Sequence, residues 1–384
     1  RLLTIQSSPA SKWMSDASSR PTFAIKFANL IKQVVKVKID IEKNCPFNSV
    51  HTPSGDVVLS SRSRLARNLE GFPFVNRATA SDCIEVTSLL HTLTKPTNDS
   101  TTLEWVNMEE LDSITTELFV ERHLVSSTLA HASHPRAIAV GPELSRSVMV
   151  NEEDHIRIQS IRPGLQLHET LEDVKALDSQ IEEIISYAFD DQLGFLTACP
   201  TNVGTGARFS AMLHLPGLRI INDLQRVHNA CEDLSLAIRG YRGEGSGTVA
   251  DLFQVSNQVT LGSTQQDLCK VLADDFLPPV IEWERKARDF IVDKQKSKLD
   301  DQTFRSLGVL QNARLLTAEE AMQCLGNIRL GVCMQLVDSI SVQKINQLMI
   351  ELHPAHIKHK YGIELTDEEV QHCRATLIRN SFQT

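Results

Sequence analysis

The chain has 384 residues, 41% hydrophobic and 5% aromatic, which is enough for a sizeable core and more than one domain. Its 39 basic and 48 acidic residues give a formal net charge of −9, which argues against non-specific binding to nucleic acid or to an anionic membrane. The first residues lack the apolar core of a signal peptide and no apolar run approaches the ~20 residues that span a bilayer, so the sequence predicts a soluble, cytoplasmic protein.

Residues 1–55 are predicted to be an N-terminal extension or insertion whose role the sequence does not reveal. The stretch begins with polar, serine-rich residues and ends in a turn-rich segment, 44–55. Between them, Phe27, Leu30, Ile31 and Val34 share the spacing of one helical face, which predicts an amphipathic helix over 23–35.

From Asp56 onwards, short runs of β-branched and other apolar residues predict buried strands. The predicted strands are 56–62, 137–140, 147–151, 156–161 and 208–214. The clearest helix between them covers 170–188, where Thr170 and Asp173 have the spacing of a capping box, and another follows Asn222. Because strands and helices do not alternate regularly, we expect an α+β fold with a largely antiparallel sheet flanked by helices over 56–262.

After about Gly262 the strand signals fade, and residues 263–384 are predicted to form a small all-helical domain. The predicted helices are 265–276, 280–297, 317–325, 341–352 and 366–378. Two of them begin with the spacing of a capping box, Thr317 with Glu320 and Thr366 with Glu369.

The eight cysteines are scattered and form no C-x-x-C pair, which argues against a zinc site and against a compact disulfide framework. Most are expected to be buried free thiols. Cys199 differs, because it opens a segment rich in glycine and polar residues.

The familiar nucleotide-binding motifs are missing, since the chain has no G-x-x-x-x-G-K-[ST] and no G-x-G-x-x-G after a strand. Arginines stand instead beside the predicted strand ends: Arg62, Arg64, Arg157, Arg208 and Arg239. Arg62 and Arg64 are two positions apart, so on a strand both would point to the same side and present two planar guanidinium groups to phosphate oxygens. Each arginine alone is more readily explained as a solvated or ion-paired surface residue. Several of them in short polar segments of an acidic chain favour an anion site.

These arginines lie in segments 60–68, 151–157, 199–208 and 239–244. The segments resemble, in the same order, the signature segments of the ATP:guanido phosphotransferases, a family that includes creatine and arginine kinases and the bacterial protein-arginine kinases of the McsB type. The resemblance continues through 253–262 into the helical tail, so it covers the chain from about Asp56. It implies the guanido kinase catalytic fold, and ATP with Mg²⁺ as cosubstrate and cofactor.

The resemblance also implies roles for individual residues. The ATP-binding residues would be Arg62, Arg64, His123, Arg157, Arg208 and Arg239, with His123 stacked on adenine. The catalytic residues in contact with the guanidinium group would be Glu153, Glu244 and Cys199. Glu152 and Asp154 would lie near Mg²⁺, through water.

The chemistry of the substrate supports these roles independently. A guanidinium group with a pKa above ~12 is cationic and a poor nucleophile, so the site must orient it with carboxylates and remove a proton. Glu153 is the better candidate for the base, Glu244 for a clamp in a glycine-rich loop, and Cys199 for a thiolate helped by Arg208 and Thr201. Taken singly, the acidic triplet Glu152–Asp154 could be an exposed turn and Cys199 a core residue. His123 could be an ordinary surface or core histidine.

The substrate is expected to be arginine within a protein. Creatine and arginine kinases carry a helical domain ahead of the first signature segment, whereas the residues ahead of Ser60 show little helical signal here. Segments 65–69, 123–126, 157–159, 305–308 and 377–379 are closer to the McsB type. By resemblance, the helical domain would serve dimerisation into a homodimer and substrate contact. The protein would mark others for Clp-type proteolysis and act on stress regulators, with an activator protein and Clp protease components as partners.

Two alternatives stay open: a kinase for free arginine, and a non-catalytic adaptor that binds arginine-bearing proteins. An adaptor would be marked by loss of a catalytic glutamate or phosphate arginine, and none is missing.

The chain departs from the family pattern in two places. Residues 15–55 stand where the family has a short link, and the Arg-Asp-x-x-Arg-Ala motif that binds phosphoarginine in several McsB proteins is reduced here to Arg374 and Ala375. Allosteric binding of phosphoarginine at Arg374 therefore rests on half a motif.

Overall fold

The computed structural model describes residues 52–92, 103–141, 143–241 and 248–382. These residues belong to one compact unit, 41–384. The helix predicted over 23–35 lies outside the described residues, as does nearly all of the predicted extension. Among the described residues, no helix is both long and apolar enough to cross a membrane.

Within the described residues the main sheet has eight strands in the order β2-β3-β4-β5-β1-β8-β10-β9, with antiparallel neighbours throughout. The strands are β1 (Val58–Arg67), β2 (Glu104–Asn107), β3 (Ala137–Val140), β4 (Arg146–Val150), β5 (Ile156–Pro163), β8 (Ala207–His214), β9 (Leu236–Gly240) and β10 (Leu252–Asn257). A separate hairpin pairs β6 (Phe189–Asp190) with β7 (Gly194–Phe195). The predicted antiparallel α+β fold is confirmed.

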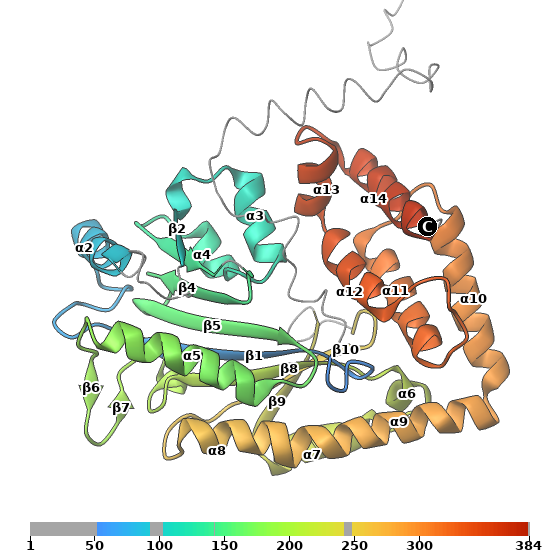
Figure 1. Cartoon of the computed structure of the whole chain (residues 1–384), viewed down its shortest axis with the longest axis horizontal. Helices are drawn as coiled ribbons and strands as arrows, with labels where there is room; N and C mark the ends of the chain where they lie inside the picture. Colours follow the sequence, from blue (N-terminus) through green and yellow to red (C-terminus); the bar gives the residue numbers. More distant parts are fainter. Residues whose placement is uncertain (1–51, 93–102, 142, 242–247, 383–384) are drawn as a thin grey trace, which may run out of the picture. The chain divides into compact units, whose positions relative to one another are not determined.

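One face of the main sheet is apolar and covered by helices (Figure 1). The helices are α5 (Leu167–Glu182), α7 (Leu224–Asp233), α8 (Gln265–Lys270), the π-helical segment η6 (Val271–Phe276) and α9 (Leu277–Lys294). They share a core with buried strand residues such as Leu65, Ile158 and Phe209. Because side chains alternate along a strand, the residues between these positions point to the opposite face.

The predicted start of α5 was wrong. The helix begins at Leu167, and its N-cap Gln166 makes no side-chain cap hydrogen bond. Thr170 is instead buried against Ser63, and Asp173 binds Arg162 and Ser160 on β5. The two side chains have the spacing of a capping box but are used for tertiary contacts with the sheet.

Short helices complete the part of the chain before residue 263: α2 (Ala80–His91), η4 (Met108–Glu110), α3 (Ser113–Glu121), α4 (Ser127–His131), η5 (Pro200–Asn202) and α6 (Pro216–Ile220). The tail forms α10 (Lys296–Asn312), α11 (Ala318–Cys333), α12 (Val342–Glu351), α13 (Pro354–Tyr361) and α14 (Asp367–Ser381). The predicted capping box of Thr366 and Glu369 is present, and Thr317 caps α11 through the Glu320 amide. The sequence did not predict α10 and α13.

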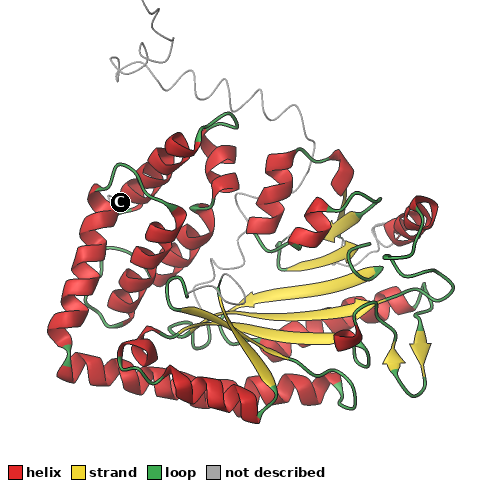
Figure 2. Cartoon of the chain, turned by 180° about the vertical axis from the view of Figure 1, so that it is seen from behind, coloured by secondary structure: helices red, strands yellow, loops and turns green. Residues whose placement is uncertain are grey.

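The helices α10 to α14 gather beside one end of the sheet (Figure 2). Their apolar residues form a second core, which also includes Val249, Ala250 and Leu252 at the start of β10. Gly326 on α11 lies against Ala250 so closely that a Cβ there would be 2.9 Å from the Ala250 Cα atom. The division of the chain at residues 55 and 262 stays a prediction, and α8 and α9 share the core of the sheet although they follow residue 262.

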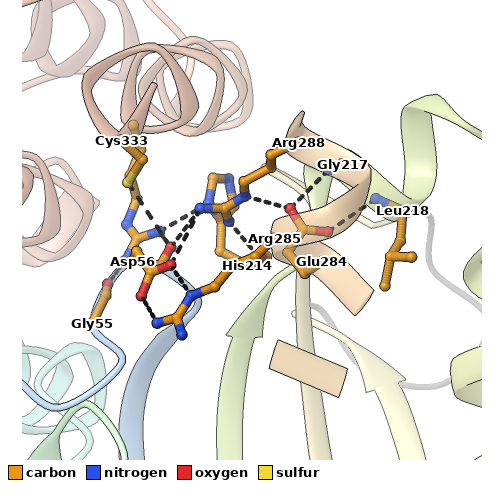
Figure 3. Close-up of polar contacts among 10 residues, drawn as sticks. Gly55, Asp56, His214, Gly217, Leu218, Glu284, Arg285, Arg288 and Cys333 are labelled. Atoms are coloured by element: carbon orange, nitrogen blue, oxygen red, sulfur yellow. Dashed lines mark hydrogen bonds and ion pairs between the residues drawn. The ribbon is translucent and has the colours of Figure 1, made fainter. Parts of the chain in front are cut away.

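A buried polar cluster joins α11 and α9 to the residues that precede β1 (Figure 3). The Arg329 guanidinium, on α11, is fully buried and donates to the carbonyl oxygens of Gly55 and Asp56, to Asn346 Oδ1 and to His214 Nδ1. Arg288, on α9, donates to the His214 carbonyl oxygen and to Glu284. One cluster of guanidinium groups therefore satisfies three backbone carbonyls from two parts of the fold, the residues before β1 and the end of β8.

We expect Arg329→Met to lower the free energy of unfolding by about 3 kcal/mol, because it leaves several buried acceptors without a donor. Urea unfolding measures the change. Arg305→Met is the matched control, because Arg305 is exposed on α10 and pairs with Asp301 of the same helix. A similar loss of stability in both variants would contradict the anchoring role.

Candidate active site

The face of the sheet opposite the apolar core carries arginines on neighbouring strands. On β1, Ser61, Ser63 and Leu65 are buried toward the core, so Arg62 and Arg64 point to the other side. Arg64 lies directly opposite Arg208 of β8 in the strand register, while Ala66 is opposite Arg157 of β5. Like charges directly opposite each other destabilise a sheet. This face therefore has a structural reason to bind an anion.

The electrostatics of the cluster point the same way. Burial lowers the pKa of Arg62 to about 10, and Arg208 and Arg157 add to the shift. Burial lowers the pKa of Arg64 well below its usual value, again with contributions from Arg62, Arg157 and Arg208. The pKa of Arg208 is lowered by burial and then by Arg239 and Arg157. Each shift records a cost of holding several cations together away from water.

Hydrogen bonding leaves part of this cluster unsatisfied. Arg62 Nε donates to Ser210 Oγ at 3.4 Å, and Arg208 Nη2 donates to Ser256 Oγ at 3.2 Å. Among the described residues, the buried Nε atoms of Arg64 and Arg208 have no hydrogen-bond partner. Buried donors are normally paired, so these two atoms indicate a ligand with acceptor oxygens.

The acidic triplet forms a tight loop between β4 and β5. Asn151 adopts a left-handed φ of 57°, and its side-chain amide donates to the carbonyl oxygens of Cys83 and Pro135. Glu152 is buried, and its carboxylate lies 2.6 Å from Arg157 Nη1. Glu153 is exposed, with an oxygen 3.3 Å from Arg157 Nη2. The loop thus presents one carboxylate to solvent at the edge of the arginine cluster.

The segment that carries Cys199 folds back over the end of β1. Cys199 Sγ lies 3.0 Å from Thr201 Oγ1, and Cys199 acts electrostatically on Arg208. Gly204 has a φ of +108°, and a Cβ there would lie 2.6 Å from the Thr260 carbonyl oxygen. Gly206 has a φ of +63°, and its Cβ would lie 2.5 Å from the carbonyl oxygen of Ala66. Both positions require glycine, which explains their place in the signature segment.

The acidic loop and the Cys199 segment are tied together by a buried carboxylate. Asp154 Oδ1 accepts hydrogen bonds from Asn68 Nδ2 and from the Ala198 backbone N–H, each at 2.7 Å. Burial raises the pKa of Asp154, while these two donors and Arg157 oppose the shift. Ala198 and Asp154 adjoin Cys199 and Glu153 in sequence, so the bond holds the candidate thiol and the candidate base on one side of the site.

A cavity of about 480 Å³ opens beside the arginine cluster. Its lining includes Thr201, Arg208, Arg239 and Thr260. It therefore connects the segment that carries Cys199 with the end of the sheet that carries the outermost arginine.

A protein-family model described as "ATP:guanido phosphotransferase, C-terminal catalytic domain" matches residues 85–287, more than half of the chain. A protein-arginine kinase from Geobacillus stearothermophilus is 41% identical over 333 residues, which cover 86% of this chain and 92% of the relative. The chain belongs to the ATP:guanido phosphotransferase family. Residues 296–384 match a second model, "Protein-arginine kinase McsB C-terminal domain", so the chain falls in the protein-arginine kinase group of that family.

Further comparisons agree with this assignment. A protein-arginine kinase from Clostridium novyi is 39% identical over 339 residues, covering 87% of this chain and 97% of the relative. A solved structure of lombricine kinase matches 64% of this chain and 70% of its own with a TM-score of 0.55 and 22% identity. The duplicated taurocyamine kinase from Schistosoma mansoni matches with a TM-score of 0.53 and 23% identity, over 61% of this chain and 33% of its own. These two structures bear on the fold alone.

This guanido phosphotransferase brings most of the predicted site residues together. His123 follows α3 with a left-handed φ of 58°, and its carbonyl oxygen accepts from Gln159 Nε2 on the sheet at 2.7 Å. Its ring lies within electrostatic range of Arg62. Glu244 lies outside the described residues. Arg374 lies apart from the site, buried among the C-terminal helices, where it donates to the carbonyl oxygens of Leu352 and Leu316.

Sequence reasoning missed the residues that position these groups. Asn68 stands in the first signature segment and Ser126 just after His123, yet neither was assigned a role. Ser126 Oγ donates to Glu152 at 2.5 Å, and Asn68 also accepts from the His155 backbone N–H. Only their place inside the signature segments could have marked them, because a buried amide or hydroxyl leaves no pattern in a sequence.

The kinase should lose stability in acid partly through His123. Burial lowers the pKa of His123 from 6.5 to about 4, with Arg62, His353 and His356 adding to the shift. Between pH 6.5 and 4 the unfolded chain therefore binds a proton at His123 that the folded protein does not bind. The contribution of a neutral His123 to the free energy of unfolding is complete above pH 6.5 and is lost as the pH falls toward 4.

Between pH 7 and 5 we expect the free energy of unfolding to fall by about 1–2 kcal/mol more in the wild type than in His123→Gln. Urea unfolding at the two pH values measures the difference. Parallel pH dependences in the two proteins would contradict a His123 that stays neutral in the folded protein.

Proposed function

We propose that this guanido phosphotransferase transfers the γ-phosphoryl group of ATP to the guanidinium group of arginine residues in proteins. One observation carries the proposal. Arginines with buried, unpartnered Nε atoms lie on the sheet beside an exposed loop carboxylate, Glu153, and the segment that carries Cys199. The arginines suit phosphate oxygens, and the carboxylate together with Cys199 suits a guanidinium group.

In this proposal, Arg62, Arg64, Arg157, Arg208 and Arg239 hold the phosphates. Phosphoryl transfer has a loose transition state whose charge must be positioned and neutralised, and a cluster of fixed guanidinium groups does both. The mutual repulsion within the cluster is relieved when the phosphates bind. By the family resemblance His123 would contact the adenine, and its turn is fixed to the sheet by Gln159.

The acceptor side of the reaction is proposed to depend on Glu153 and Cys199, with Glu244 as the second carboxylate. Glu153 takes a proton from the attacking nitrogen as the N–P bond forms and the bond between the γ-phosphorus and the bridging oxygen of ADP breaks. Cys199 Sγ, within hydrogen-bond distance of Thr201, lies beside the guanidinium group and helps to orient it. The protein forms no covalent intermediate.

We propose that Mg²⁺ accompanies the nucleotide. The described residues contain no group of three or more His, Cys, Asp or Glu side chains arranged to hold a metal ion, and Mg²⁺ bound to phosphates needs only one or two carboxylates, often through water. Asp154 has a buried Oδ2 atom without a hydrogen-bond partner in the described part of the chain, and Glu152 lies two positions earlier in the same loop. These oxygens suit contact with Mg²⁺ through water, and Mg²⁺ would neutralise charge at the phosphates.

The proposal of protein-bound arginine as substrate is supported by the curated relatives, which are named protein-arginine kinases, and by the match of residues 296–384 to the C-terminal domain of that group. We extend it to a cytoplasmic homodimer that marks proteins for a Clp-type protease, acts on stress regulators and responds to an activator protein. This extension is supported by the family resemblance alone.

The test is to incubate the purified protein with Mg-ATP and either an unfolded protein or free arginine. Phosphorus NMR and mass spectrometry then detect acid-labile N-phosphate. We expect phosphoarginine in the unfolded protein. Product on free arginine alone would contradict the substrate, and ATP binding without any phosphoarginine would favour a non-catalytic adaptor.

A further inference from the structure

A carboxylate of the catalytic part, on a side chain that is 15% exposed, caps a helix of the C-terminal domain. Glu121, the last residue of α3, accepts hydrogen bonds from the backbone N–H groups of Ala355 and His356 at 2.8 and 3.0 Å. These groups belong to the first turn of α13, where backbone donors lack partners within their own helix. The N-cap residue of α13, His353, makes no side-chain cap hydrogen bond. Glu121 therefore supplies the cap from another part of the fold, where the helix dipole favours a negative charge.

The same carboxylate is linked to two buried side chains, His356 and, through it, Arg122. His356 Nδ1 lies 2.7 Å from Glu121 Oε2, and Arg122 Nε donates to His356 Nε2 at 2.9 Å. Because arginine is always a donor, Nε2 must accept and the proton of the imidazole lies on Nδ1, facing Glu121. Arg122 and His356 are only 7% and 8% exposed. Both imidazole nitrogens of His356 thus have a partner, and only one tautomer satisfies both contacts.

This contact is adjacent to the candidate adenine residue. His123 follows Glu121 and Arg122 directly, and its left-handed φ of 58° is unfavourable for a residue with a side chain. The turn is held on one side by the bond from Gln159 to the His123 carbonyl oxygen, and on the other by the attachment of Glu121 and Arg122 to α13.

The corner between α12 and α13 reaches a second part of the site as well. His353 Nε2 lies 3.2 Å from the hydroxyl group of Tyr241. Tyr241 stands two positions after Arg239, and its backbone N–H donates to the Leu252 carbonyl oxygen on β10. The corner formed by His353 to His356 therefore contacts both the His123 turn and the end of the strand that carries an arginine of the cluster.

We propose that Glu121 and His356 are positioning residues for the nucleotide: through the His123 turn, the docking of α13 on α3 sets the affinity for ATP and ADP. This inference rests on the proposed function, because it assumes that the nucleotide binds on the arginine face. The C-terminal domain then influences the nucleotide site directly, because any shift of α13 changes the contacts of Glu121 and Arg122 that hold the His123 turn.

The test is equilibrium binding of ADP, measured by calorimetry on the full chain without any arginine substrate. Glu121→Ala removes all three hydrogen bonds, and we expect ADP binding to weaken on the order of tenfold. Glu121→Gln keeps only one acceptor oxygen, whereas Ala355 N–H uses Oε1 and His356 uses Oε2, so its NH2 group faces a donor. We therefore expect it to weaken ADP binding as well, by less than Glu121→Ala. Glu117→Ala is the matched control, because Glu117 lies on the same helix, is exposed and pairs with His131.

A double-mutant cycle separates positioning from general stabilisation. In a His123→Ala background, Glu121→Ala should cause no further loss of ADP affinity, because the group through which it acts is gone. An equal loss in both backgrounds, or none in either, would overturn the inference. If Glu121→Ala fails to fold, His356→Asn in the same two backgrounds gives the same comparison. A wild-type protein that does not bind ADP at all would count against the proposed function instead.

Discussion

Arg64→Met is expected to make the nucleotide-free protein more stable and, at the same time, unable to bind ATP well. Arg64 is half-buried, directly opposite Arg208 and close to two further arginines, and its buried Nε atom has no hydrogen-bond partner among the described residues. Replacing such a charge by an apolar side chain of similar length removes repulsion and breaks no hydrogen bond of the Nε atom. The melting temperature should therefore rise by about 3 °C. The loss of a charge-assisted contact with phosphate should weaken ATP binding on the order of 100-fold.

Arg162→Met is the matched control for this prediction. Arg162 is also on the sheet, but it forms a two-pronged contact with Asp173, at 2.7 and 2.8 Å. The variant should therefore lower the melting temperature and leave ATP binding unchanged. Differential scanning fluorimetry with and without ATP measures both effects. If Arg64→Met destabilises the nucleotide-free protein, Arg64 makes stabilising contacts without a ligand. That result would contradict an arginine cluster that is destabilising until an anion binds.

Glu153→Gln is expected to abolish most of the catalysis while leaving the affinity for ATP close to that of the wild type. The side chain is exposed at the edge of the arginine cluster, and a glutamine there keeps the size but cannot take a proton. General base catalysis contributes on the order of 10²–10⁴-fold, and we expect kcat to fall within that range. Single-turnover phosphorylation of an unfolded protein measures the rate, and calorimetry measures ATP binding.

Glu172→Gln is the control, since Glu172 is exposed on α5 and pairs only with Lys175 among the described residues. Its rate should equal that of the wild type. A Glu153→Gln enzyme with an unchanged rate would remove Glu153 from the role of base. A large loss of ATP affinity in the same variant would instead mean that its contact with Arg157 organises the phosphate site.

The parts of the fold that follow from local patterns were predictable. The antiparallel strands were readable from short runs of β-branched and other apolar residues, as in β4, where Val148 and Val150 are buried. The box of Thr366 and Glu369 was also readable, because both partners lie within one turn of a helix. Thr170 and Asp173 have the same spacing but were misread, since their partners, Ser63 and Arg162, lie elsewhere in the chain.

The candidate site divides in the same way. The clustering of the arginines, with Glu153 beside Arg157, could be predicted from recognisable segments, while the roles of these side chains stay a proposal. The groups that position them could not. Asn68 joins Asp154, and Glu121 caps α13, through contacts that span 86 and 234 positions of the chain. Nothing in the local sequence marks a residue whose partner is that distant.

The central claim is that the arginine face of the sheet binds the phosphates of ATP. The most direct measurement is a crystal structure of the protein with Mg²⁺ and an ATP analogue whose γ-phosphate cannot be transferred. We predict phosphate oxygens within hydrogen-bond distance of Arg64 Nε and Arg208 Nε, the two buried donors that have no partner among the described residues. Phosphates bound elsewhere, with both Nε atoms still unpaired, would contradict the account.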